Sequence, residues 1–249
     1  MSKPGDEQEE DLPETMRSTR NLLLEGLVIV ASILLAFAID AGWDEVRERE
    51  QEQRLLAQLS DELALFIDNL GPNSRLLSGR VETNIEQLLA LVHESENVAD
   101  DEWMTSLGFL PRAYEFTAAT PVIDLLTADG GLQLISDPAI REELSNVSSF
   151  LGVVNRFETL QGNFIANEMI PWLNRNVDRY AIALKMNPDW ADDRPTSRFG
   201  TEVDAVRTRE FSNLLMERDR LLGLVTLFRN QTLERMENLR ELVEQRLEE

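Results

Sequence analysis

The sequence of 249 residues contains no cysteine and a single histidine, His93. Without cysteine there is no disulfide bond, no thiolate metal site and no cysteine nucleophile. One histidine also excludes zinc sites built on paired histidines and di-iron bundles that need two Glu-x-x-His motifs. A lone histidine near the end of a predicted helix is most often structural. The chain is therefore poor in the side chains that bind metals or act as nucleophiles.

Positive charge is the second scarcity. The chain has 24 Lys and Arg residues against 46 Asp and Glu residues, a formal net charge of -22, and its only lysines are Lys3 and Lys185. Phosphate binding needs clustered cations, so the composition argues against a nucleic-acid partner and against docking on anionic lipid headgroups. The acidity would suit a cationic partner, but a solubilising surface is the simpler interpretation.

Recognisable catalytic motifs are missing as well. No G-x-S-x-G, Walker loop or G-x-G-x-x-G occurs, so common hydrolase and nucleotide-binding signatures are absent. Two acidic clusters lack the glycine and the spacing of a dedicated calcium loop; their members are Glu94, Glu96, Asp100, Asp101, Glu102, Asp192 and Asp193. We therefore predict no catalytic residue, no cofactor and no metal site. An unrecognised hydrolase that uses Asp and Glu is an alternative.

The chain does contain one long apolar segment, LLLEGLVIVASILLAFAIDAGW, at residues 22–43. Residues 26–39 carry no charge, and Glu25 and Asp40 flank them. A helix of this length reaches roughly 30 Å, the hydrocarbon thickness of a bilayer. The segment predicts one transmembrane helix over 21–43. The alternatives are a buried core helix, which usually has a polar stripe, and a cleaved signal peptide, which usually has a basic start and a small-x-small site.

Helical spacing places several residues of this segment on one side: Glu25, Ser32, Ala36, Asp40 and Trp43. Small residues four apart allow a second helix to approach closely in lipid, and a carboxylate near the membrane edge is better tolerated against protein than against acyl chains. We predict a helix–helix interface here, either with a second copy of the chain or with another membrane protein. The alternative is that small residues are simply common in such helices and that Glu25 extends toward water.

Two segments carry a resemblance to a known group of proteins. In residues 25–45 a Glu opens the apolar run VIVASILLAFAID and a Trp-Asp-Glu closes it, and residues 120–144 read TPVIDLLTADGGLQLISDPAIREEL. Both resemble segments of uncharacterised bacterial single-pass inner-membrane proteins that have a helical domain of unknown function. The resemblance implies a bacterial inner-membrane location and supplies no active site.

The orientation of the predicted transmembrane helix is a separate question from its existence. Members of the group usually have a basic N-terminal tail, which implies a cytoplasmic N-terminus and a periplasmic body. The tail of this chain is acidic, and arginines lie on both sides of the apolar segment, at Arg17 and Arg20 and at Arg47 and Arg49. The count of positive charges therefore does not settle the topology, and the periplasmic body is an expectation from the resemblance.

The rest of the chain predicts an all-α body at 44–249, preceded by a disordered acidic tail at 1–20. Apolar residues recur three and four apart at Leu56, Leu59, Leu63, Phe66 and Leu70, a heptad-like seam that must pack on another helix. The sequence Gly-Pro-Asn at 71–73 predicts a kink or an end of that helix. We expect an elongated antiparallel bundle with long, coiled-coil-like helices, at about 44–70, 73–94, 138–169 and 202–249.

Turn and cap signals mark the middle of the body. Thr120 before Pro121 and Asp137 before Pro138 each combine a capping side chain with a proline that tolerates the first helical turn. Gly130 and the following glycine predict the end of the first of these helices. Residues 132–135 are expected to form a short connector, with an extended conformation as one option.

Arg141 follows the second cap signal, in the segment that carries the resemblance. It is four residues into the expected helix and close in sequence to two acidic residues, Asp124 and Asp129. A buried pair between Arg141 and one of these carboxylates is a structural hypothesis, because removing one partner of such a pair is strongly destabilising.

Two functions fit these observations. The first is a membrane-anchored helical protein that acts through protein–protein contacts as a scaffold, adaptor or accessory subunit, without catalysis. The second is a membrane-tethered sensor, with a ligand pocket lined by Trp103, Trp172 and Trp190 near predicted helix ends. Aromatic residues at such positions pack in cores more often than they line pockets, which favours the first function.

Overall fold

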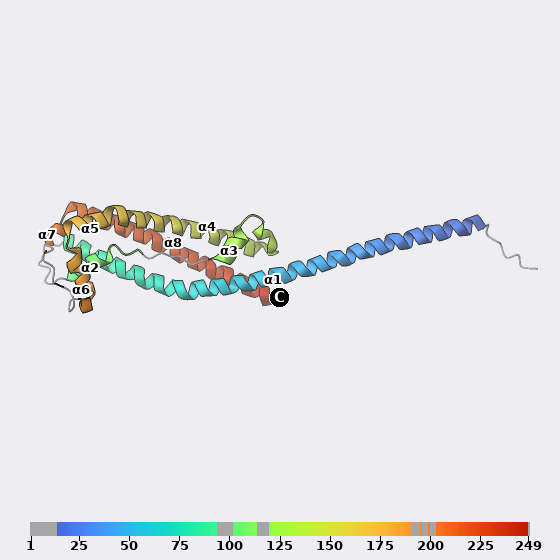
Figure 1. Ribbon diagram of the computed structural model, residues 1–249, viewed down its shortest axis with the longest axis horizontal. Helices are drawn as coiled ribbons and strands as arrows, with labels where there is room; N and C mark the ends of the chain where they lie inside the picture. The colour runs from blue at the N-terminus through green and yellow to red at the C-terminus, as the bar shows by residue number, and fades with distance from the viewer. Residues whose placement is uncertain are drawn as a thin grey trace, which may run out of the picture. The chain divides into compact units, whose positions relative to one another are not determined.

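The computed structural model describes residues 14–93, 102–113, 120–190, 195, 199 and 203–248. Every regular element in these ranges is helical (Figure 1), and no strand occurs among them. The all-α prediction is confirmed at this level. The chain divides into two compact units, Met1–Glu52 and Gln53–Glu249. Most of the predicted acidic tail, residues 1–13, lies outside the described residues.

The described part of the first unit is the beginning of the helix α1 (Glu14–His93). The predicted tail boundary at residue 20 is therefore too late, because α1 already begins at Glu14. The reason is local: residues 14–20 contain neither proline nor glycine, and the Pro13 before them is tolerated at the start of a helix.

The apolar segment of α1 is exposed in the part of the chain that the structure describes. Every residue from 26 to 37 is exposed, as are Ile39 and Trp43. None of the most apolar part of this helix is buried inside the structure. Leu27 and Phe37 each expose 67% of their surface. In the part of the chain that the structure describes, this is one helix long and apolar enough to span a membrane.

The helix does not end at the predicted Gly-Pro-Asn sequence, because α1 continues through residues 71–73 to His93. A proline inside a helix costs about 3 kcal/mol through a lost hydrogen bond and a steric clash. Core contacts on both sides offset that cost: Leu63 and Phe66 are buried before the proline, and Val81 and Ile85 after it. Each such side chain contributes about 1.5–3 kcal/mol when fully buried.

Three long helical segments form the first core of the second unit. The α1 seam packs against α4 (Pro138–Phe164) and α8 (Arg209–Glu248), and the short α3 (Pro121–Thr127) covers one end. The α4 and α8 ribbons lie side by side in Figure 1. The α1 contribution to this core is Leu56, Leu59, Leu63 and Phe66.

A second core lies further along the same helices. It joins the end of α1 to α2 (Glu102–Phe109), α5 (Ile170–Asn176), α6 (Arg179–Met186) and α7 (Val203–Val206). The early part of α8 enters this core, whereas its late part enters the first, so α1 and α8 run in opposite directions. The α8 members of the second core are Phe211, Leu215 and Leu222.

Several predicted helix boundaries differ from those observed. Pro171 does not interrupt α4, because a π-helical turn, Ile165–Met169, connects α4 to α5, and such a turn accommodates a proline within a continuous helix. The first real break is at Val177, whose backbone is extended. The connector after Gly130 is a 3-10 helix, Gly131–Leu134, and is not extended. A further 3-10 turn, Pro188–Trp190, follows α6.

The C-terminal helix begins later than predicted, at Arg209 and not at residue 202. The Thr208 hydroxyl accepts a hydrogen bond from the Phe211 amide at 3.2 Å, and the Thr208 carbonyl accepts one from Ser212 at 3.0 Å. These bonds give Thr208 the position of a helix cap. The predicted helix is thus divided into α7 and α8 by a cap signal in its own sequence.

Candidate functional site

The predicted membrane interface lies on the exposed apolar segment of α1. Ser32, Ala36, Asp40 and Trp43 are all exposed, and the side chain of Glu25 lies outside the described residues. The Ser32 hydroxyl donates a 2.8 Å hydrogen bond to the Val28 carbonyl of its own helix. Its donor is therefore satisfied inside α1, so Ser32 offers a partner helix its small size more than its hydroxyl proton.

Thr120 lies at the N-terminus of α3 as predicted, but its hydroxyl does not cap the helix. Thr120 precedes α3, but its side chain makes no capping hydrogen bond with the backbone and donates instead to Asp124 at 3.4 Å. The cap comes from another helix: the Glu62 carboxylate of α1 accepts hydrogen bonds from the amides of Val122 and Ile123, at 2.9 and 3.2 Å. This contact ties α3 to α1 over sixty residues of sequence.

The Asp137 cap is confirmed, since its carboxylate accepts hydrogen bonds from the amides of Ala139 at 2.7 Å and Ile140 at 3.3 Å. Gly130 adopts φ of 82°, a left-handed conformation that glycine reaches without strain. Gly131 beside it has no room for a side chain, because a Cβ atom there would lie 2.7 Å from the Leu126 carbonyl oxygen. The glycine pair thus closes the turn between α3 and α4.

Arg141 does not form the predicted buried pair. Asp124 and Asp129 are both exposed, and no ion pair joins either carboxylate to Arg141. The buried pair of the body is instead between α8 and α4: Arg229 donates from two nitrogens to one Glu158 oxygen, at 2.6 and 2.8 Å. The side chains of Arg229 and Glu158 are 4% and 11% exposed.

Two further arginines contribute to the packing of α8. Arg218 is completely buried and donates to the carbonyls of Leu110 and Arg112, at 3.2 and 2.8 Å. Arg235 pairs with Glu143 at 3.2 Å and lies over the ring of Phe150. Arg218, Arg229 and Arg235 therefore connect α8 to other segments of the body, which their planar, multiple donors allow.

The three tryptophans proposed for a sensor pocket are not brought together around a cavity. Trp172 is 1% exposed and stacks on Phe211 with ring centroids 4.5 Å apart. Trp103 is partly buried against the same core, and Trp190 is exposed in the 3-10 turn after α6. Trp172 and Trp103 therefore serve packing.

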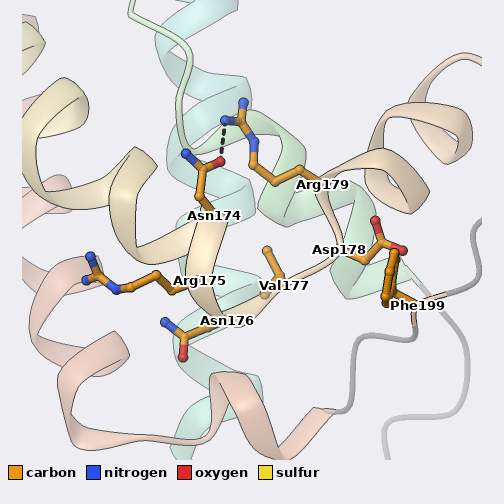
Figure 2. A pocket seen from close by; sticks show the side chains of 7 residues that line it. All are labelled: Asn174, Arg175, Asn176, Val177, Asp178, Arg179 and Phe199. Atoms are coloured by element: carbon orange, nitrogen blue, oxygen red, sulfur yellow. Dashed lines mark hydrogen bonds between the residues drawn. The ribbon is translucent and has the colours of Figure 1, made fainter.

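A cavity of about 450 Å³ lies instead where α5 turns into α6 (Figure 2), lined by residues 174–179 and Phe199. Arg179 donates to the side-chain oxygen of Asn174 at 2.9 Å, and Asn176 donates to the Trp172 carbonyl at 2.9 Å. Phe199 is 79% exposed. The lining thus combines guanidinium and amide donors with one aromatic ring.

A second hollow, of about 440 Å³, lies between α1 and α8. Its charged lining residues are Glu82, Asp219 and Arg220, and Arg220 is held by two hydrogen bonds to Glu217, at 2.6 and 2.8 Å. These bonds lower the pKa of the Glu217 carboxyl below its usual value. With its one cation already paired, this hollow is acidic and contrasts with the cavity beside Arg179.

Little in the described residues suggests catalysis. His93 Nε2 lies 3.3 Å from the Ser212 hydroxyl, at an exposed position. Among the side chains that the structure describes, no group of three or more acidic or histidine residues is placed to hold a metal ion. The predicted acidic clusters at 94–101 and 192–193 lie outside the described residues, and Glu102 begins α2.

Comparison of the chain with family models, with curated proteins and with solved structures finds no match. The resemblance to bacterial single-pass membrane proteins therefore stays a prediction.

Sequence reasoning missed the contacts that join distant segments. Glu62 lies on a charged surface of a long helix, and only its position opposite α3 makes it a cap. Arg229 and Glu158 are 71 residues apart and look like ordinary surface charges of acidic helices. One signal was available at the cavity: α5, α6 and the junction between them hold three cations, Arg175, Arg179 and Lys185, against one carboxylate, Asp178.

Proposed function

We propose that this chain is a bacterial inner-membrane protein with a single membrane-spanning helix, and that it acts through protein–protein contacts. The observation that carries the proposal is the exposure of the whole apolar segment of α1 from residue 26 to 37. Water is a poor solvent for such a surface, and the described chain offers nothing to cover it. A bilayer supplies a cover of matching thickness.

The second half of the proposal, contacts with other proteins, is supported by the body. Its first core is built from the long helices α1, α4 and α8, in keeping with an elongated antiparallel bundle and coiled-coil-like pairing. Large apolar side chains also remain exposed on α1 and α8: Leu65, Leu76, Met216 and Leu227. We propose that the partner is a second copy of the chain or another membrane protein, with the side of α1 containing Ser32 and Ala36 as the contact within the bilayer.

A membrane-tethered ligand-binding head is the second candidate. The cavity between α5 and α6 favours it, since its volume is within the range of about 300–1,000 Å³ typical of small-molecule sites. The tryptophans do not, because Trp172 is buried in the core.

Membrane fractionation tests the anchor. The full chain should stay with membranes after washing with alkaline carbonate, whereas V30R/L34R should be released, because each arginine at the centre of a span costs about 2.5–3.5 kcal/mol. Leu227→Arg, at an exposed position of the body, is the matched control and should stay membrane-bound. Release of the unaltered chain by the wash would refute the anchor.

Co-purification tests the protein contacts. The full chain, extracted in mild detergent, should emerge either with a stoichiometric partner or as a defined homo-oligomer. A monomer without partners would contradict this part of the proposal. Reporter fusions at the C-terminus give the topology, and we expect activity of a periplasmic reporter and none of a cytoplasmic one.

A further inference from the structure

The α5–α6 cavity is electrostatically unusual for this protein. The whole chain has nearly two acidic residues for each basic one, yet the segment formed by α5, α6 and their junction is net positive. Arg175 and Arg179 both line the cavity. Neither forms an ion pair with a carboxylate among the residues that the structure describes, whereas Arg220, Arg229 and Arg235 all do.

The one carboxylate in the lining is already engaged. Asp178 is the cap of α6, and its Oδ1 accepts hydrogen bonds from the amides of Tyr180 and Ala181, at 3.0 and 3.1 Å. These backbone donors and the positive end of the helix dipole compensate the Asp178 charge locally. Asp178 therefore repels an incoming anion less strongly. The guanidinium groups of Arg175 and Arg179 have no such compensation from a described carboxylate and attract the anion.

The lining also has a place for an apolar group. Phe199 exposes 79% of its surface beside Asp178, and Val177 also lines the cavity (Figure 2). Arg179 is turned toward Asn174 and Arg175 lies on the other side of the turn. Both arginines are exposed, and exposed side chains change rotamer in picoseconds to nanoseconds, so either can turn toward a ligand.

We propose that this cavity binds a small organic anion, with Arg175 and Arg179 at its carboxylate and Phe199 against a flat apolar part. Guanidinium groups match the geometry of a carboxylate, and charge-assisted hydrogen bonds are the stronger kind. The amide of Asn174 adds a neutral donor beside them. Anion binding at this cavity depends neither on the membrane anchor nor on protein contacts. A failed anion-binding experiment would therefore leave the proposed function standing, and the reverse also holds.

Binding of benzoate to the full chain in lipid nanodiscs tests the proposal, with benzamide as the neutral probe of the same shape. Ligand-observed NMR should show saturable binding of benzoate and none of benzamide. R175Q/R179Q should weaken benzoate binding about tenfold or more, since each lost charge-assisted bond is worth roughly a factor of ten. Phe199→Ala should weaken it as well, through loss of the ring contact.

Arg156→Gln is the matched control, because Arg156 is also an exposed arginine, on α4 and away from the cavity lining. It should leave benzoate binding unchanged. Arg175→Gln alone tests the same contact if the double variant loses helix content. Equal binding of benzamide, no saturable binding of benzoate up to millimolar concentrations, or equal binding by R175Q/R179Q and the unaltered chain would overturn the proposal.

Discussion

At the scale of single residues, the body contains a buried ion pair that joins α8 to α4. Arg229 and Glu158 lie almost completely out of water and are joined at 2.6 Å. Replacing one partner leaves the other as an uncompensated buried charge, which typically costs about 3–5 kcal/mol. We therefore expect Arg229→Ala to destabilise the body by about that amount, measured by urea unfolding followed by circular dichroism.

The double variant R229M/E158L tests whether the loss in Arg229→Ala comes from the uncompensated charge of Glu158. Apolar side chains of similar volume often replace a buried ion pair without loss of stability, so this variant should recover most of the loss. Arg220→Ala, which breaks an exposed pair with Glu217, should leave the stability almost unchanged. A loss for Arg229→Ala as small as this would show that Glu158 is solvated.

The Glu217 carboxyl provides a prediction on pH. Its hydrogen bonds to Arg220 lower its pKa in the folded protein. A lowered folded-state pKa stabilises the fold above the unfolded-state pKa, and this contribution is lost as the pH falls through the folded-state value. An NMR titration of the carboxyl carbon should therefore have its midpoint below that of an ordinary Glu.

The matched variant for this titration is Arg220→Gln, which should move the Glu217 midpoint back toward the ordinary value. High salt should reduce the difference, because the pair is exposed and therefore screened. An unaltered midpoint in Arg220→Gln would mean that Arg220 does not cause the shift.

At the scale of elements, the cap of α3 links two helices that are distant in sequence. Glu62 accepts hydrogen bonds from two amides at the start of α3. Loss of a capping side chain costs about 0.5–2 kcal/mol, so Glu62→Ala should lower the stability by that amount. Hydrogen exchange of the Val122 and Ile123 amides should become faster.

Two controls distinguish this cap from general helix effects. Asp61→Ala alters the exposed neighbour of Glu62 and should leave exchange at α3 unchanged. Thr120→Ala should have a smaller effect than Glu62→Ala, because Thr120 makes no capping bond with the backbone. A larger effect at Thr120 would restore the sequence-based assignment of the cap.

At the scale of the whole molecule, both cores lie in the unit Gln53–Glu249. A fragment of these residues should be soluble, helical and cooperative in thermal unfolding, since it keeps every buried apolar residue of the two cores. A fragment that begins at Leu70 lacks the seam from Leu56 to Phe66 and should unfold with little cooperativity. Aggregation of the longer fragment would mean that the body needs the apolar segment.

Features that depend on neighbours along the chain were predictable from the residues alone. Hydrophobic periodicity placed the seam at Leu56 to Phe66, the apolar run marked a helix long and apolar enough to span a membrane, and Asp137 was recognisable as a cap. Local composition is sufficient for these, because helix periodicity and capping act within a few residues.

Features that depend on contacts between distant segments became visible in the folded chain and not before. The continuation of α1 through Pro72 depends on core packing on both sides, and the cap from Glu62 and the pairing of Arg229 depend on which helix lies opposite. The arginines of the α5–α6 cavity, which form no ion pair with a described carboxylate, belong to the same class. A single sequence shows that such a side chain is charged, but folding alone decides whether it meets a partner, a helix end or water.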